Sequence, residues 1–242
     1  MSKKQLFPST KSLMSRPRIL EEYGAGNIVI EPFVADNVGT NQYDVTLGPY
    51  YYRANGVLKN APEVAGIPLY NPYSESDVRS LWRQYKAEHL VNVKEKLQWS
   101  QDLENISPDD RVIIIMPGET ILGHTLEYIG GACNNVTTIM KARSTSGRNM
   151  ITVCRDAGQG DVGYFTRWTM EISNNSRSHA YPLVVGRRIA QLVFFETDPV
   201  DDLYTKQGKY QTDDDLEVIK ANWSPEDMLP KKWRDREVRS SK

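Results

Sequence analysis

The feature that most constrains the fold is a series of short apolar or alternating segments between residues 111 and 195, with turn residues between them. Turn dipeptides such as Pro117-Gly118 and Gly130-Gly131 punctuate the series. The segments are 112–116, 120–128, 136–142, 150–154, 164–173, 183–185 and 189–195. Many short strands separated by turns are typical of an antiparallel sandwich or a distorted barrel. The sequence therefore predicts a mainly β domain.

Two earlier segments, 26–33 and 43–48, extend this domain towards the N-terminus, and a block of different character follows them. In that block, residues 53–108, prolines punctuate a loop, and helical spacing of apolar residues predicts a helix from Ser74 to about Val93. Ser74 and Asp77 resemble a capping box at the start of this helix. Because the block carries no catalytic constellation, we interpret it as a structural or regulatory insertion.

These patterns divide the chain into three parts. Residues 1–23 are basic and rich in hydroxyl groups and are predicted to form an N-terminal arm. Residues 24–203 form the β domain with its insertion. The charged residues 204–242 form a C-terminal tail that is either a mobile flap or disordered.

Composition excludes several classes of partner. The net charge of the 242 residues is −1, which predicts neither a general nucleic-acid surface nor a membrane surface, so any phosphate binding must be local. Cys133 and Cys154 give neither a metal-binding spacing nor a disulfide framework, as expected in a reducing cytosol. No segment resembles a signal peptide or a membrane span. We expect a soluble cytoplasmic protein.

A polar turn follows the predicted strand 136–142. Arg143-Ser144-Thr145-Ser146-Gly147-Arg148 combines two guanidinium groups, three hydroxyl groups and a glycine. A strand that runs into such a turn leaves backbone N–H groups free, and with arginine at each end the turn suits a phosphate chain. A helix N-cap with two solvated arginines explains the same residues equally well.

Glu171 is the candidate catalytic carboxylate. Alternation along 164–173 places Trp168, Met170 and Ile172 on a core face, and Glu171 on the opposite, polar face. A glutamate on such a face is usually solvated. If another subunit or the 143–148 turn covers it, its pKa rises towards neutrality, which suits proton transfer.

Upstream of this strand lies Asp161-Val162-Gly163-Tyr164. The aspartate can accept a hydrogen bond from a sugar hydroxyl, and the tyrosine ring can lie against a deoxyribose. Asp and Gly are also ordinary turn residues, so the pattern alone is weak.

Together these motifs resemble the dCTP deaminase family of the dUTPase-like superfamily. The resemblance includes the turn 143–148, Ala157-Gly158, Asp161 to Tyr164, and Thr169-Met170-Glu171-Ile172-Ser173-Asn174. Further matching segments are 26–33, 43–48, Pro117-Gly118-Glu119, Thr125-Leu126-Glu127 and Arg188-Ile189-Ala190-Gln191-Leu192. The insertion 53–108 and the C-terminal end are not covered.

The resemblance implies a homotrimer of distorted, jelly-roll-like β-barrels with active sites at the subunit interfaces. It implies hydrolytic deamination of dCTP to dUTP and ammonia without zinc. In this reaction Glu171 activates the water that attacks carbon 4 of cytosine and then protonates the leaving ammonia. Ser144 and Arg148 position and polarise the water and the base.

The resemblance also implies a set of substrate-binding residues, with Mg²⁺ bound through the triphosphate rather than by the protein. Residues 143 and 145–148 would hold phosphates, and Asp161 the deoxyribose hydroxyl. The backbone at Thr169 and Met170 would read the pyrimidine edge, and the tail would close over the nucleotide. The binding residues implied are Arg143, Thr145, Ser146, Gly147, Arg148, Asp161, Tyr164, Thr169, Met170, Tyr204 and Lys209.

The residues themselves argue against zinc chemistry. Zinc deaminases use a His-x-Glu motif and a Pro-Cys-x-x-Cys motif. This sequence has neither motif, since its histidines are His89, His124 and His179 and its two cysteines are widely separated.

Three positions depart from the family pattern. Asp213 stands where a phosphate-binding glutamine is usual, so either the tail register is shifted, bringing Gln207 or Gln211 into use, or the phosphate grip is altered. Thr166 replaces a usual glycine, and Gln159 replaces a basic or bulky residue. These departures leave the substrate preference open.

Three other functions stay open at this point. A dUTPase would use Asp161 to orient the attacking water, although Glu171 favours a deaminase. A bifunctional enzyme that converts dCTP to dUMP would keep Glu171. A non-catalytic nucleotide-binding protein is favoured only by the insertion and by Asp213.

Overall fold

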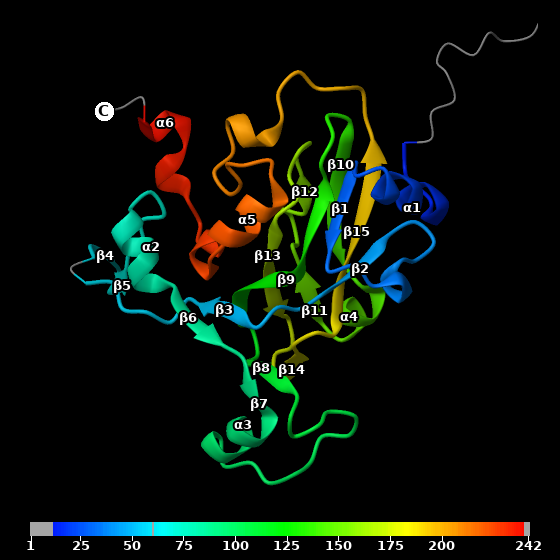
Figure 1. Ribbon diagram of the computed structural model, residues 1–242. Helices are drawn as coiled ribbons and strands as arrows, with labels where there is room; N and C mark the ends of the chain where they lie inside the picture. Colours follow the sequence, from blue (N-terminus) through cyan, green and yellow to red (C-terminus); the bar gives the residue numbers. More distant parts are fainter. Residues whose placement is uncertain (1–11, 60, 240–242) are drawn as a thin grey trace, which may run out of the picture.

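The structure, a computed structural model, describes residues 12–59 and 61–239. Residues 1–11 of the predicted arm and 240–242 of the predicted tail lie outside the described residues. The described chain forms two main β-sheets that face each other across a common core (Figure 1).

The larger sheet has the order β11-β13-β9-β3-β6, with β1 also paired to β9. Its strands are β1 (Ile28–Glu31), β3 (Tyr50–Arg53), β6 (Arg83–Lys86), β9 (Thr120–Gly131), β11 (Ile151–Val153) and β13 (Arg167–Asn174). The second sheet has the order β12-β10-β15-β2 and consists of β2 (Tyr43–Thr46), β10 (Val136–Ala142), β12 (Gln159–Gly160) and β15 (Arg188–Glu196). Every strand pairing among the described residues is antiparallel, which confirms the predicted mainly β class.

Alternation along each strand builds the core. On β13 the side chains of Trp168, Met170 and Ile172 are buried, as predicted, while the intervening side chains are only half-buried. From the second sheet, Met140 on β10 and its partner Leu192 on β15 fill the space between the sheets. All the predicted strands are present. The segment 164–173 becomes a strand only from Arg167, because residues 161–164 form a turn in which Gly163 has φ +87°.

The insertion adds smaller elements. It contains the hairpin β4 (Glu63–Val64) and β5 (Ile67–Pro68), followed by the helix α2 (Glu75–Leu81). Next, β7 (Glu88–His89) and α3 (Leu90–Lys96) lie beside β8 (Arg111–Ile115), which pairs with β14 (Tyr181–Val184).

The predicted helix 74–93 is wrong between Leu81 and Leu90, and its last residues belong to the separate helix α3. Ser74 caps α2 as expected, because its hydroxyl accepts a hydrogen bond from the N–H of Asp77 at 3.3 Å. Residues 83–86, however, form β6, which pairs with β3, and Tyr85 stacks on Tyr51 with 5.5 Å between ring centroids. A sheet edge was thus available to this segment, and strand pairing outweighed its helical spacing.

Short helices lie at both ends of the chain. Near the N-terminus are α1 (Arg16–Gly24), whose Ile19 is buried, and the 3₁₀ turn η1 (Ala35–Asn37). The C-terminal segment contains η2 (Tyr204–Lys206), α5 (Leu216–Asn222), η3 (Pro225–Met228), η4 (Lys232–Arg234) and α6 (Arg236–Arg239). Ile219, Met228 and Leu229 are buried, so the alternative of a disordered tail is wrong for the described residues. Motion of this segment as a flap stays a prediction.

His124 links β9 to the C-terminal segment. Its imidazole is fully buried, with Nδ1 2.7 Å from the Thr125 carbonyl oxygen and Nε2 accepting a hydrogen bond from the Tyr50 N–H at 3.2 Å. Trp223 packs on the ring with 4.8 Å between centroids. Burial lowers the pKa of His124 to about 4. A proton on Nε2 would face the Tyr50 donor, so the neutral form is the one that fits.

We expect the free energy of unfolding to fall as the pH drops from about 6.5 to about 4, because the unfolded chain binds a proton at His124 that the folded chain excludes. The full loss is about 3 kcal/mol, at 1.36 kcal/mol per pKa unit. Urea unfolding at about pH 5 and about pH 7 should show the larger part of this loss, about 2 kcal/mol. His124→Gln should flatten this dependence, whereas His179→Gln, at an exposed position, should not. Equal pH slopes in the parent and His124→Gln would contradict the assignment.

Candidate active site

A cavity of about 360 Å³ opens beside β13, within the size range of small-molecule sites. Its polar lining comes from Gln159, Asp161, Thr169, Glu171 and the tyrosines 164, 204 and 210. The other lining residues are Leu122, Ala157, Gly160, Trp168, Met228 and Pro230. Five predicted site residues, Asp161, Tyr164, Thr169, Glu171 and Tyr204, therefore meet in one cavity.

Glu171 reaches this cavity from the half-buried face of β13. Burial raises the pKa of its carboxyl group, and hydrogen bonds from its own N–H and from the Cys154 thiol oppose that rise. The same surroundings, first burial and then the Glu171 charge, raise the pKa of the Cys154 thiol to about 12. Cys154 therefore stays protonated and acts as a donor. The sequence offered no signal for this role, because Cys154 follows β11 and only the pairing of β11 with β13 brings it to Glu171.

Cys154 also ends the pairing of β11 with β13. Its φ is +46°, its N–H donates to the Glu171 carbonyl at 3.1 Å, and its Sγ lies 3.7 Å from the Thr169 carbonyl oxygen. Because backbone groups alternate along a strand, those of Thr169 face this open edge and those of Met170 face β9. Thr169 can therefore offer its backbone to a ligand in the cavity. The fully buried Met170 does not line the cavity.

Three aromatic rings and a turn shape one side of the cavity. The Tyr164 N–H donates to the Asp161 carbonyl at 3.1 Å, which closes the turn and leaves Asp161 exposed at the cavity mouth. The Tyr164 ring packs edge-on against Trp168 and Tyr204, with centroid distances of 5.3 and 5.1 Å. Burial raises the pKa of Tyr164 above its usual range, so this residue serves as a neutral ring.

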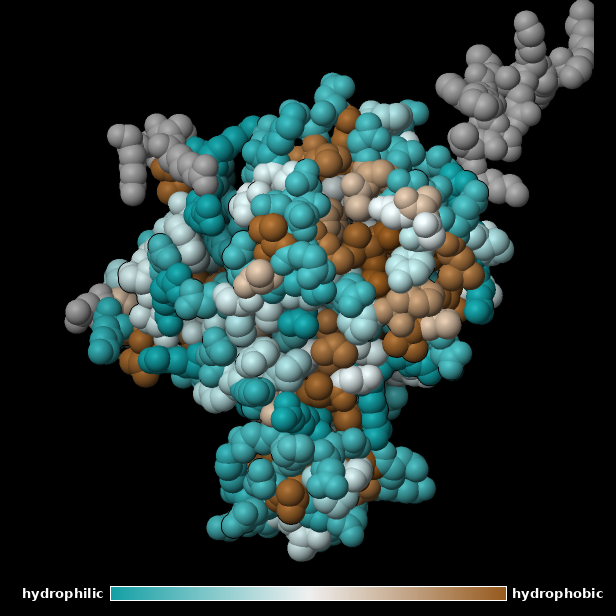
Figure 2. Space-filling view, viewed as in Figure 1, coloured by the Kyte–Doolittle hydropathy of each residue, from teal (hydrophilic) through white to brown (hydrophobic). Residues whose placement is uncertain are grey.

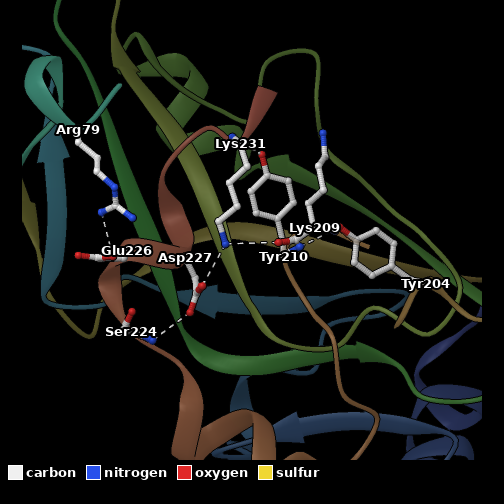
Figure 3. A network of polar contacts seen from close by, with 8 residues as sticks. All are labelled: Arg79, Tyr204, Lys209, Tyr210, Ser224, Glu226, Asp227 and Lys231. Carbon is white, nitrogen blue, oxygen red and sulfur yellow. Dashed lines mark hydrogen bonds and ion pairs between the residues drawn. The ribbon is translucent and has the colours of Figure 1, made fainter. Parts of the chain in front are cut away.

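Lys209 does not line the cavity; its ammonium pairs with the Asp235 carboxylate. The Tyr204 hydroxyl accepts hydrogen bonds from the N–H groups of Lys209 (3.2 Å) and Tyr210 (3.4 Å). Figure 3 shows the Tyr210 ring between the side chains of Lys209 and Lys231, whose nitrogens lie 5.9 and 5.2 Å from the ring centroid. Tyr210, which the sequence reasoning missed, thus enters the cavity while Lys209 points elsewhere.

The structure explains most of the departures in sequence. Gln211 is buried, and its amide donates to the carbonyls of Gly163 (2.9 Å) and Asp213 (3.0 Å) and accepts from the Phe165 N–H (2.8 Å). It fastens the C-terminal segment to the β domain and is not free to bind phosphate. The Asp213 carboxylate accepts a hydrogen bond from Asp215 just before α5 and does not line the cavity.

The two remaining departures, Thr166 and Gln159, differ in their position relative to the cavity. Thr166 is buried outside the cavity, whereas Gln159 lines it and can contact a ligand.

The polar turn forms the one-turn helix α4 (Ser144–Arg148), with Arg143 at its N-cap and no side-chain cap. The Arg143 guanidinium pairs with Asp44 (3.1 Å), and the Ser146 hydroxyl donates to the Ile189 carbonyl (3.2 Å). Ser144, Thr145, Gly147 and Arg148 are exposed. None of residues 143–148 lines the Glu171 cavity of the same chain. The turn therefore starts a short helix, as the cap interpretation expects, but it has no side-chain cap, and of its two arginines only Arg148 is solvated. Within one chain the turn and Glu171 are not brought together.

Asp44 is the buried anchor of this turn, since its carboxylate also pairs with Arg188 (3.3 Å) and accepts a hydrogen bond from Gln191 (3.2 Å). Only 9% of its side chain is exposed. We expect Asp44→Asn to lower the free energy of unfolding by ~1–3 kcal/mol, because two guanidiniums lose their common partner. Chemical denaturation measures the loss, and Asp36→Asn, at an exposed position, is the control. Equal stability of the two variants would contradict the anchoring role.

In residues 12–59 and 61–239 no three His, Cys, Asp or Glu side chains are grouped so that they could hold a metal ion. No helix in this part of the chain is both long and apolar enough to cross a membrane.

Comparisons with known proteins agree with these motifs. A family model described as dCTP deaminase-like matches residues 13–197. A "dCTP deaminase, dUMP-forming" of Halobacterium salinarum is 30% identical over 207 residues, which cover 84% of this chain and 91% of the relative. A "dCTP deaminase" of Halorubrum lacusprofundi is 26% identical over 219 residues, covering 88% and 93%.

The fold has a counterpart among solved structures. The crystal structure of the 2′-deoxycytidine 5′-triphosphate deaminase from Agrobacterium tumefaciens superposes with a TM-score of 0.50 at 15% identity. The match covers 77% of this chain and 48% of that chain, so it spans about half of the bacterial protein. It supports a dUTPase-like fold. From the span of the family model and the identity of the relatives, the chain belongs to the dCTP deaminase family of enzymes, within the dUTPase-like superfamily.

Proposed function

We propose that the protein deaminates dCTP to dUTP and ammonia by metal-free activation of water. The observation that carries this proposal is the position of Glu171, a half-buried carboxylate with a raised pKa in a cavity large enough for a nucleoside. Asp161 at the cavity mouth can accept the deoxyribose hydroxyl, and Tyr164 and Tyr204 offer apolar ring surface to the sugar and base.

Glu171 transfers protons in both halves of the reaction. As a carboxylate it takes a proton from water, and the hydroxide adds to carbon 4 of cytosine. The protonated carboxyl group passes this proton to ring nitrogen N3. The carboxylate then takes the proton of the new hydroxyl group on carbon 4 and delivers it to the amino nitrogen, and ammonia leaves as the carbon–oxygen double bond forms. A pKa raised towards neutrality suits a group that must both accept and donate. The protonated Cys154 thiol can donate a hydrogen bond to the carboxylate, and the Thr169 backbone at the open strand edge can bind the pyrimidine.

The arginine-rich turn enters the site from a second copy of the chain. Within one chain α4 presents Ser144, Thr145 and Arg148 to solvent, away from its own cavity. We propose a homotrimer in which α4 of a neighbouring copy faces the Glu171 cavity, so that Ser144 and Arg148 reach the water and the base. Arg143, Thr145, Ser146 and Gly147 would then lie along the phosphates.

Exposed apolar surface supports such an assembly. Figure 2 shows apolar residues gathered on the face where Figure 1 draws α1, β1 and β2. Exposed apolar side chains in this part of the chain include Leu20 (38%) and Val34 (45%). An apolar patch of this kind is a common feature of subunit contacts. A monomeric mass in light scattering would contradict the trimer.

Mg²⁺ would enter with the nucleotide. The side chains of residues 143–148 are hydroxyls and guanidiniums and include no carboxylate, so the turn fits the anionic triphosphate better than a bare cation. The phosphate oxygens would be the ligands of the ion. Its role would be to neutralise the triphosphate while the protein residues orient it.

A bifunctional enzyme that forms dUMP is the second candidate. Relatives in this family include both "dCTP deaminase" and "dCTP deaminase, dUMP-forming", and the exposed Asp161 could orient a water for phosphate hydrolysis. Purified protein incubated with dCTP or dUTP and Mg²⁺ distinguishes the candidates. Ammonia with dUTP indicates the deaminase, whereas ammonia with dUMP and pyrophosphate from dCTP indicates the bifunctional enzyme. Pyrophosphate from dUTP alone indicates a dUTPase, and no product from either nucleotide overturns a catalytic role.

A further inference from the structure

The insertion, residues 53–108, contributes no residue to the cavity that contains Glu171, and it packs against the C-terminal segment. Val78 of α2 is fully buried in one cluster with Met228 and Leu229 of the C-terminal segment and with Tyr52 and Leu122 of the β domain. The partly buried rings of Tyr70, Trp82 and Trp233 surround this cluster. Figure 1 shows α2 and the C-terminal helices side by side, far from each other in sequence.

A polar contact joins the same two parts of the chain. The Arg79 guanidinium lies 3.0 Å from a Glu226 carboxylate oxygen across this contact (Figure 3). Both side chains are about half exposed, so the pair contributes little free energy, and most of the attachment must come from the buried cluster.

Polar contacts within the C-terminal segment connect Asp227, the neighbour of Glu226 in sequence, with the cavity wall. Ser224 and Asp227 form a capping box that fixes η3, and Asp227 pairs with Lys231 at 3.1 Å. The Lys231 N–H donates to the Tyr210 hydroxyl at 3.1 Å, and its ammonium donates to the Lys209 carbonyl at 3.3 Å. Tyr210, Met228 and Pro230 line the cavity that contains Glu171. The residues attached to α2 are thus the same stretch that forms one wall of the cavity.

We propose that the insertion holds the C-terminal segment in position. Val78 and Arg79 are then positioning residues for the cavity wall, which consists of Tyr210, Met228 and Pro230. Each copy of the chain then closes its own cavity with its own C-terminal segment, before any nucleotide binds. The attachment follows from the contacts alone, whereas its effect on nucleotide binding rests on the proposed function. Neither Val78 nor Arg79 lines the cavity, so both can be changed without removing a cavity residue.

Amide hydrogen exchange of residues 224–234 in the nucleotide-free protein tests the attachment. Val78→Asp places a charge in the buried cluster and should increase the exchange of these amides at least ~10-fold. The control is Val64→Asp in the same insertion, where the side chain is 60% exposed; it should leave the exchange unchanged. Unchanged exchange in a folded Val78→Asp protein, or an equal increase in the control, would overturn the proposal.

A charge exchange gives a second test that does not disturb the cluster. Arg79→Glu and Glu226→Arg should each increase the exchange of residues 224–234 by about 2–5-fold, as expected for an exposed pair replaced by like charges. The double variant should be better protected than either single variant, although not fully restored, because Arg79 also pairs with Glu75 at 3.0 Å within α2. This comparison decides the question if Val78→Asp fails to fold. A double variant no better protected than the single ones would overturn the proposal.

Kinetics then test the positioning of the wall. With dCTP as substrate, Val78→Asp should raise KM at least ~10-fold and change kcat much less, because the wall binds the nucleotide but takes no part in proton transfer. If the exchange increases and KM does not, the insertion holds the C-terminal segment but does not position the cavity wall. The positioning part of the proposal then fails. If the parent protein does not deaminate dCTP, the proposed function fails while the exchange experiments still decide the attachment.

Discussion

Glu171→Gln should abolish ammonia release, with a loss of at least ~10²–10⁴-fold in kcat, the usual contribution of a positioned general acid–base group. Glutamine keeps the size of the side chain and one acceptor oxygen but cannot accept the proton from water. Nucleotide binding, measured by calorimetry, should therefore change little. Glu63→Gln, at an exposed position on β4, is the matched control and should retain full activity.

A stability measurement shows whether Glu171→Gln is inactive because it lacks the carboxylate or because it is misfolded. Burial raises the pKa of Glu171, so between the unfolded and folded pKa values the folded state binds the proton more tightly. The contribution of Glu171 to stability is therefore lost as the pH rises through this window, so the stability of the parent relative to Glu171→Gln should fall there. Deamination by the variant at close to the parent rate would show that Glu171 is not the catalytic base.

The second large effect concerns the sharing of the site between copies. Arg148→Ala and Ser144→Ala should each lower kcat/KM at least ~100-fold, although neither residue lines the cavity of its own chain. Equal amounts of Arg148→Ala and Glu171→Gln, each nearly inactive, should regain activity when co-assembled. With random mixing, about one quarter of the sites pair an intact Glu171 with an intact Arg148 from a neighbour.

Formation of mixed oligomers is checked with distinguishable affinity tags. No recovery in verified mixed oligomers would place Glu171 and Arg148 in the same chain's site and contradict the shared arrangement. Near-normal activity of Arg148→Ala and Ser144→Ala alone would mean that the polar turn is only a helix start.

Local patterns were sufficient for the strands. The side-chain alternation of β13 correctly assigned Trp168, Met170 and Ile172 to the core and left Glu171 on the accessible face. Alternation and turn residues are encoded within a few consecutive positions, so they can be recognised without knowledge of the partner strand. The cap of α2 at Ser74 was predicted correctly for the same reason.

Contacts between distant segments were not predictable from such patterns. Helical spacing extended the predicted helix past Leu81, but pairing with β3 made residues 83–86 a strand. Lys209 was expected at the nucleotide and instead pairs with Asp235, and Gln211, a candidate for phosphate binding, is buried. Each outcome depends on a partner that is remote in sequence or on a neighbouring sheet edge.

By itself the sequence determined the mainly β class, the face of β13 that carries Glu171, and the motifs of the dCTP deaminase family, because each is written in short runs of residues. Only the tertiary structure decided that Cys154 contacts Glu171, that Tyr210 enters the cavity, and that the insertion and the C-terminal segment pack together. The physical reason is that burial and hydrogen bonding are settled by which distant segments meet in space, and this choice depends on the whole chain.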